Sequence, residues 1–156
     1  MSRLAEVVAA LQDAGIDHAL IGAMALAALG MPRSTLDIDL RFGDEMDPLA
    51  GVVRIDPEGS EPIDLVVGRP PRWQKAILER ARTRVIALAG AKVPIVEPAD
   101  LVLLELYAGG PRDHRDIEDL LELPSMSSFA AEVDGRVADL PTRCREAWSR
   151  LRPATR

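Results

Sequence analysis

Short segments with the two-residue periodicity of strands alternate along this chain with segments of helical periodicity, and a glycine or proline ends most of them. These frequent glycine and proline residues limit the elements to short strands and to helices of a few turns. Helices are predicted over residues 2–14, 23–29, 72–81, 98–108 and 112–123, with two more after Pro124 and Pro141. Strands are predicted over 18–21, 36–42, 51–56, 63–67, 83–89 and 93–96, the last two as a hairpin around Gly90-Ala91. The order of these elements predicts a mixed α+β (or α/β) fold with a small mixed sheet and a helical C-terminal third.

The length of 156 residues fits a single domain with its own core. We expect residues 1–97 to form its α/β core and residues 98–156 its helical C-terminal part. The longest uncharged run, residues 19–32, is shorter than the ~20 apolar residues that a membrane helix needs, so no membrane association is expected. The single cysteine, Cys144, cannot form an internal disulfide, which favours a reducing, cytoplasmic location.

Charge is distributed in blocks, although the net charge is only −6. Residues 1–68 and 97–134 are both strongly acidic, whereas residues 69–84 carry six basic residues and one acidic residue. A site that binds a metal ion on one side and a polyanion on the other would show such zones, and so would ordinary solvated surface. The basic run 69–84 is the best candidate for an RNA-binding surface.

Two aspartates share one face of the predicted strand 36–42. Asp37 and Asp39 point to the same side of this strand, and its apolar residues point to the other. Neighbouring carboxylates repel each other unless a cation or a basic side chain neutralises them. Mg²⁺ fits such a pair, because it takes one or two carboxylates and completes its coordination with water and phosphate oxygens. The alternative is an exposed strand face on which Arg33 or Arg41 pairs with the two aspartates.

Gly22 and Asp64 extend this constellation. Gly22 stands where the first predicted strand turns into a helix, and the free N–H groups at a helix start can cradle an anion. Asp64 is flanked by apolar residues on a strand that we expect to pair near the strand of Asp39. Three carboxylates can hold two metal ions ~3.5–4 Å apart, which clamps the attacking and leaving oxygens of an in-line displacement. In that arrangement Asp64 would also accept the proton of an acceptor hydroxyl.

The order of these residues resembles the signature of the nucleotidyltransferase (DNA polymerase β-like) superfamily. That signature is glycine followed by glycine or serine, a short gap, Asp-x-Asp between apolar residues, and a third aspartate on a later strand. In this chain Gly22-Ala23 precedes Asp37-Ile-Asp39, and Asp64 follows. The downstream segment 93–117 is similar to the AbiEii/MenT-type toxin branch of that superfamily.

The resemblance implies a nucleotidyltransferase fold and a Mg²⁺-dependent transfer of NMP from an NTP to an acceptor hydroxyl. It also implies a toxin of a toxin–antitoxin pair, with tRNA or another RNA as the acceptor and an antitoxin protein as a partner. The metal-binding and catalytic residues that it implies are Asp37, Asp39 and Asp64. The nucleotide-binding residues that it implies are Gly22 and Ala23 in the phosphate loop, and Arg112, Asp113 and Asp116 in the downstream motif.

Two positions differ from the family pattern. Ala23 replaces the usual glycine or serine, so a hydroxyl contact to phosphate is lost while the backbone amide remains. Glu105 stands where the family has a lysine that would contact the triphosphate, and a carboxylate there would repel the γ-phosphate. Arg33, Arg112 and Lys92 are the candidates to supply this charge instead.

Alternative functions follow from these differences. The chain could be a catalytically inactive module of the same fold that binds a nucleotide or a protein. It could also be a small-molecule, antibiotic-type nucleotidyltransferase, because the acidic block 97–134 would suit a cationic acceptor.

The two aspartates of the downstream motif also have an alternative explanation. Asp113 and Asp116 could be acidic residues that the helix dipole favours in a first turn.

Overall fold

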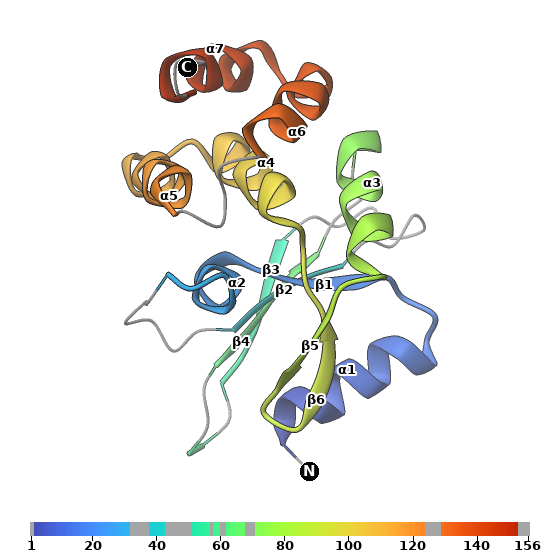
Figure 1. The fold of residues 1–156 in the computed structure, drawn as a ribbon. Coiled ribbons are helices and arrows are strands. Elements are labelled where there is room, and N and C mark those ends of the chain that lie inside the picture. Colours follow the sequence, from blue (N-terminus) through green and yellow to red (C-terminus); the bar gives the residue numbers. More distant parts are fainter. Residues whose placement is uncertain are drawn as a thin grey trace. The chain divides into compact units, whose positions relative to one another are not determined.

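The computed structural model describes residues 2–31, 38–42, 51–56, 58–59, 62–67, 71–123 and 129–152. The chain divides into two compact units, Met1–Glu97 and Pro98–Arg156. Within the described ranges, the first unit combines three helices with two small sheets, and the second unit is helical (Figure 1). This combination confirms the predicted mixed α+β class. No helix in those ranges has both the length and the apolar character needed to cross a bilayer.

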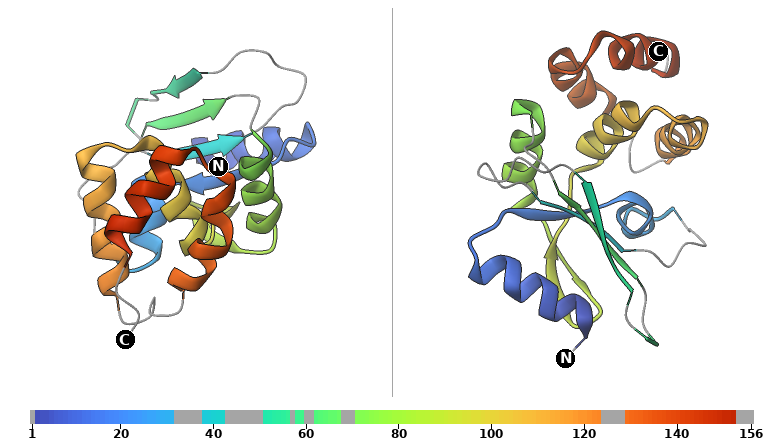
Figure 2. Two further views of the ribbon diagram at one scale, coloured as in Figure 1. Left: turned by 90° about the horizontal axis from the view of Figure 1, so that it is seen from above. Right: turned by 180° about the vertical axis from the view of Figure 1, so that it is seen from behind.

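A four-stranded sheet forms the centre of the first unit. Its strands are β1 (His18–Ile21), β2 (Ile38–Phe42), β3 (Gly51–Ile55) and β4 (Ile63–Val67). They lie in the order β1-β2-β4-β3, as Figure 2 shows, with β2 and β4 parallel and the other neighbours antiparallel. The sheet is therefore mixed, as predicted, and β1 and β4 have the predicted bounds.

Three helices accompany this sheet in the first unit. They are α1 (Arg3–Asp13), α2 (Gly22–Ala28) and α3 (Arg72–Ala81). Ser2 caps α1, because its Oγ accepts the N–H of Ala5 at 3.2 Å and so satisfies one of the N–H groups at the helix start. The apolar sides of α1 and α3 contribute to the core with Leu4, Val8, Leu11, Trp73, Ile77, Leu78 and Ala81.

A hairpin of β5 (Val85–Leu88) and β6 (Ala91–Pro94) forms the second sheet. Its turn is Ala89-Gly90, one residue earlier than the predicted Gly90-Ala91. Both turn residues have positive φ, 46° and 81°. A two-residue hairpin turn of this kind matches the twist of the strands. Ala91 is thereby drawn into β6, where it pairs with Leu88.

The second unit contains α4 (Pro98–Ala108), α5 (Pro111–Glu122), α6 (Phe129–Arg136), a 3₁₀ turn (Val137–Asp139) and α7 (Thr142–Leu151). The predicted bounds of α4 are confirmed, and so are the two helices expected after Pro124 and Pro141. Side chains from all four helices form its core, namely Leu101, Leu103, Leu106, Ile117, Leu120, Val133 and Trp148.

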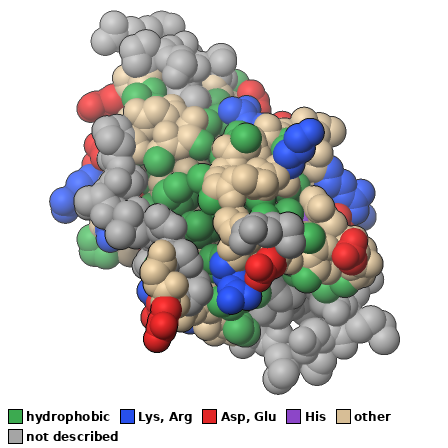
Figure 3. Space-filling model, turned by 90° about the horizontal axis from the view of Figure 1, so that it is seen from below, with side chains coloured by type: hydrophobic (Ala, Val, Ile, Leu, Met, Phe, Trp, Pro, Cys, Tyr) green, Lys and Arg blue, Asp and Glu red, His purple; other side chains and the backbone are tan. Residues whose placement is uncertain are grey.

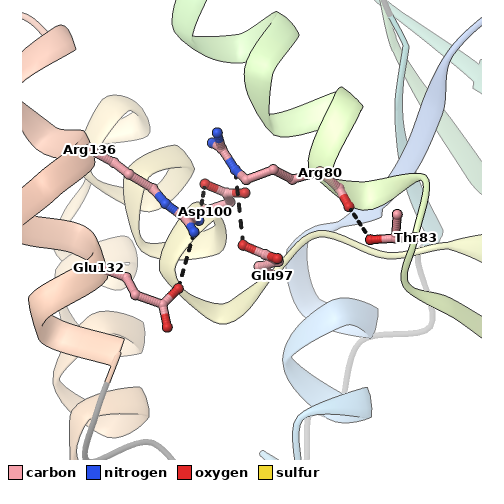
Figure 4. A network of polar contacts seen from close by, with 6 residues as sticks. All are labelled: Arg80, Thr83, Glu97, Asp100, Glu132 and Arg136. Carbon is pink, nitrogen blue, oxygen red and sulfur yellow. Dashed lines mark hydrogen bonds and ion pairs between the residues drawn. The ribbon is translucent and has the colours of Figure 1, made fainter.

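Arg136 binds two carboxylates of the second unit (Figure 4). Its Nη1 donates to Asp100 Oδ1 at 2.9 Å, and its Nη2 donates to Glu132 Oε2 at 3.1 Å. Asp100 is fully buried in the first turn of α4. A buried carboxylate needs such a partner because it has lost its hydration. The ion pair therefore ties α6 to the start of α4.

The hydrogen-bonded carboxylate of Asp134 makes the free energy of unfolding depend on pH. Arg152 Nη2 and Trp148 Nε1 donate to the Asp134 carboxylate at 2.6 and 2.8 Å. The hydrogen bond from Arg152 contributes most, and that from Trp148 contributes next, to holding the pKa of Asp134 below its usual value. A lowered folded-state pKa stabilises the fold above the unfolded-state pKa, and this contribution is lost as the pH falls through the folded-state value.

We therefore expect Asp134→Asn to lower the free energy of unfolding at pH 7 by about 1 kcal/mol or less, because the pair is partly exposed. The difference between wild type and variant should shrink when urea unfolding is repeated at pH 3. A difference that stays constant over this pH range would show that the charge of Asp134 contributes nothing.

Candidate functional site

The strand register places Asp39 and Asp64 next to each other. Asp39 on β2 is the partner of Asp64 on the parallel strand β4, so both carboxylates project from the same face of the sheet. Ile21 is the partner of Asp39 on β1, and Arg54 is the partner of Asp64 on β3. The row Ile21–Asp39–Asp64–Arg54 therefore crosses all four strands. The pairing predicted for the strands of Asp39 and Asp64 is confirmed.

Gly22 allows the chain to turn directly against Asp39. Strand β1 ends at Ile21, and α2 begins at Gly22 with a φ of +64°. A Cβ atom at Gly22 would lie 2.5 Å from Asp39 Oδ2 and 3.2 Å from its Cγ. Only glycine provides both this conformation and this close approach at low cost. The turn and the carboxylate thus form one packed unit.

Arg54 contacts the second carboxylate of the row. Its Nη1 donates to Asp64 Oδ2 at 3.0 Å and to Asp64 Oδ1 at 3.3 Å. The Asp64 side chain is 17% exposed and that of Arg54 is 47% exposed. The sequence reasoning did not single out Arg54. The available signal was an arginine within the predicted strand 51–56, one strand before the strand of Asp64.

The donor set suits a hard divalent cation. Asp39 and Asp64 supply carboxylate oxygens on one face, and the missing Cβ of Gly22 lets Asp39 Oδ2 lie directly against the turn between β1 and α2. Among the described residues, no group of three or more His, Cys, Asp or Glu side chains is placed to hold a metal ion. Asp37, which was also predicted to bind the metal ion, lies outside the described residues. The two carboxylates fit Mg²⁺, which commonly takes one or two of them and fills its other positions with water and phosphate oxygens.

The remaining predicted site residues fall in different places. Arg33 lies outside the described residues, and Ala23 is the half-buried second residue of α2. Arg112, Asp113 and Asp116 share the first turns of α5 in the second unit.

Two carboxylates of α5 have distinct environments. Asp113 Oδ2 accepts the N–H of Gly110 at 2.7 Å, so its carboxylate has a local role at the start of the helix. Asp116 is buried, with 7% of its surface exposed, whereas Arg112 is exposed. Glu105, at the position of the family lysine, is also largely buried on α4.

A shallow hollow is lined by residues of α1 and by the end of β3, and by neither carboxylate of the row. It has a volume of about 440 Å³ and is lined by Arg3, Glu6, Val7, Ala10, Ile55 and Asp56. In the view of Figure 3, hydrophobic side chains gather towards the middle of the visible face, with charged side chains among them and at its edges. None of the predicted site residues lines this hollow, so it is not part of the candidate site.

No protein-family model matches this chain, and no curated protein matches it. The solved structures that are similar to it include the following two. One is an antigenic nucleotidyltransferase-like protein from Paracoccidioides brasiliensis, with a TM-score of 0.46 and 14% identity over 95% of this chain and 85% of that chain. The other is the antibiotic-resistance factor ANT(2'')-Ia, with a TM-score of 0.43 and 16% identity over 96% of this chain and 86% of that chain. At these values neither likeness decides what this chain does.

Proposed function

We propose that this protein is a Mg²⁺-dependent nucleotidyltransferase that transfers NMP from an NTP to an acceptor hydroxyl. The observation that carries this proposal is the register pairing of Asp39 with Asp64, with Asp39 packed against the glycine turn between β1 and α2. Carboxylates are seldom placed side by side without a charge to neutralise them. Arg54 supplies one positive charge to this pair, and a divalent cation bound to a triphosphate would supply the rest.

The chain's own residues would position the reactants. Asp39 and Asp64, together with Asp37, would hold Mg²⁺, which when bound neutralises charge on the phosphates. A hydroxyl oxygen of the acceptor attacks the α-phosphorus, the bond to pyrophosphate breaks, and the hydroxyl proton passes to an Asp64 oxygen. A carboxylate has about four lone-pair sites, so Asp64 can accept this proton while it also accepts hydrogen bonds from Arg54. Positioning and charge neutralisation then supply most of the rate enhancement.

The acceptor that we propose is RNA, with tRNA as the first candidate. The support is the basic run 69–84, whose described part includes the exposed Arg72 and Arg84. Arg82 of this run is engaged in an ion pair with Asp17. A toxin controlled by an antitoxin protein is the biological role that we propose for such an activity. The nucleotide-binding roles of Gly22, Ala23, Arg33, Arg112, Asp113 and Asp116 stay predictions.

Label transfer tests the function directly. The purified protein is incubated with Mg²⁺ and each NTP in turn, labelled at either the α- or the γ-phosphate, in the presence of tRNA, total RNA or an RNA-free lysate. We expect α-label to be transferred to RNA from one NTP, with release of pyrophosphate.

Two outcomes would contradict the proposal. Transfer of γ-label would indicate a phosphotransferase. Retained NTP binding without any transfer would indicate an inactive binding module, with Glu105 as the residue to examine next. Transfer of α-label to a small molecule of the lysate would keep the reaction and replace the acceptor.

A further inference from the structure

We propose that Arg54 is a positioning residue for Asp64. Arg54 holds the Asp64 carboxylate beside Asp39 and lowers the affinity of this carboxylate for the cation. The proposal rests on the nucleotidyl transfer proposed above and adds a residue to its site. Arg54 lies on β3, outside every motif that suggested the function. Its assignment comes from the strand order and from the contacts of its guanidinium group.

The geometry of the contact restrains the carboxylate. A single nitrogen, Arg54 Nη1, lies within hydrogen-bond distance of both Asp64 oxygens, at 3.0 and 3.3 Å. Arg54 is also the register partner of Asp64, so its backbone is fixed directly opposite by the β3–β4 ladder. Charge-assisted bonds of this kind are stronger than neutral hydrogen bonds and define a preferred orientation. Asp64 is therefore held in place from the side of β3, while Asp39 lies on the side of β2.

The charge of Arg54 also acts on any cation held by the row. The guanidinium neutralises part of the negative charge of two adjacent carboxylates. A divalent cation that shares Asp64 with Arg54 is repelled by the guanidinium, because both charges are positive. Removing the charge of Arg54 should therefore strengthen cation binding and, at the same time, free the Asp64 carboxylate to rotate. Affinity and turnover are expected to change in opposite directions.

A purely structural role for Arg54 predicts something different. β3 is an edge strand whose residues Gly51, Val52, Val53 and Arg54 are exposed. An exposed ion pair contributes little to stability, so the fold should tolerate the loss of the Arg54 side chain. If Arg54 only stabilised this edge, its removal would lower the melting temperature and leave both cation affinity and the turnover of the folded protein unchanged.

The test uses Mn²⁺ alone as the binding probe, and the concentration of the free ion is measured by electron paramagnetic resonance. The values of kcat and KM are measured in parallel. The variants are Arg54→Gln, Arg54→Lys and Asp39→Asn. Arg3→Gln is the matched control, because it removes the same charge from the exposed Arg3–Glu6 pair of the same unit. Thermal unfolding of each variant verifies that it is folded.

We expect Arg54→Gln to bind Mn²⁺ about 5-fold more tightly, because a neighbouring positive charge is gone. Its kcat should fall about 10- to 100-fold at a similar KM, because a small misplacement of a reacting group has an effect of this order. Arg54→Lys should restore most of both values, since one cationic nitrogen makes both contacts in the wild type. Arg3→Gln should match the wild type.

The outcomes separate the two proposals. If the wild type binds Mn²⁺ through Asp39 but Arg54→Gln has unchanged or weaker affinity, or unchanged kcat, the role of Arg54 is refuted and the proposed function stands. If the wild type does not bind Mn²⁺, or if Asp39→Asn binds it equally well, the proposed function fails and the role of Arg54 fails with it.

Discussion

We expect the replacement of Asp39 with asparagine to lower the proposed NMP transfer about 1000-fold, which is the size of effect seen when a group that stabilises transition-state charge is removed. Asparagine has nearly the same shape, so the variant fits beside Gly22 as aspartate does. The substitution removes the negative charge that would bind Mg²⁺ and leaves Asp64 as the single carboxylate of the register row.

The measurement combines kcat/KM with thermal unfolding at several Mg²⁺ concentrations. Mg²⁺ should raise the melting temperature of the wild type, since a ligand that binds only the folded state stabilises it, and should leave that of Asp39→Asn unchanged. Asp13→Asn is the control, because it neutralises an exposed aspartate at the end of α1. If Mg²⁺ still raises the melting temperature of Asp39→Asn, Asp39 is not a ligand of the metal ion.

Replacing Gly22 with alanine should disable the site and destabilise the fold together. An alanine at φ +64° is strained, and its Cβ would lie 2.5 Å from Asp39 Oδ2. Either the turn between β1 and α2 or the Asp39 side chain must move. We expect the free energy of unfolding to fall by about 2–5 kcal/mol, which is the sum of backbone strain and steric overlap. Transfer activity and the stabilisation by Mg²⁺ should both be lost.

Gly15 provides a matched control for this substitution. Its φ is +67°, and no atom lies within 4 Å of the place that a Cβ would take. Gly15→Ala therefore measures the backbone strain alone by urea unfolding, and the excess destabilisation of Gly22→Ala measures the contact with Asp39. The double variant Gly22→Ala/Asp39→Ala should recover part of the stability without any activity. Equal effects of Gly15→Ala and Gly22→Ala would mean that the turn is not packed against Asp39.

Local sequence signals predicted most elements of the described residues. β1 ends where Gly22 takes a left-handed conformation, and α4 begins at Pro98, where the missing N–H of proline costs nothing. The hairpin turn was misplaced because Ala89 adopts a positive φ that alanine disfavours in isolation. Pairing of β5 with β6 determines that conformation and overrides the intrinsic preference of alanine.

The candidate site was predictable only in part. Periodicity and spacing identified Asp39, Asp64 and Gly22, which the structure brings together. They did not identify Arg54, because the periodicity of β3 and β4 does not show the register that places Arg54 opposite Asp64. The sequence suggested Arg33 or Arg41 as the basic partner of the aspartates, and Arg54 takes this place for Asp64. Register depends on the turn between the strands and on packing of the sheet, so periodicity alone does not show which residues face each other across two strands.

The parallel pairing of β2 with β4 also determines when the two carboxylates meet during folding. β3 and β4 are consecutive and antiparallel, so they can associate as a local pair. β2 and β4 are parallel, and a tight turn cannot join them. Contacts that close a longer stretch of chain carry a greater entropic cost and form late. We therefore expect the pairing of β2 with β4, and with it the repulsion between Asp39 and Asp64, to form after the β3–β4 pair.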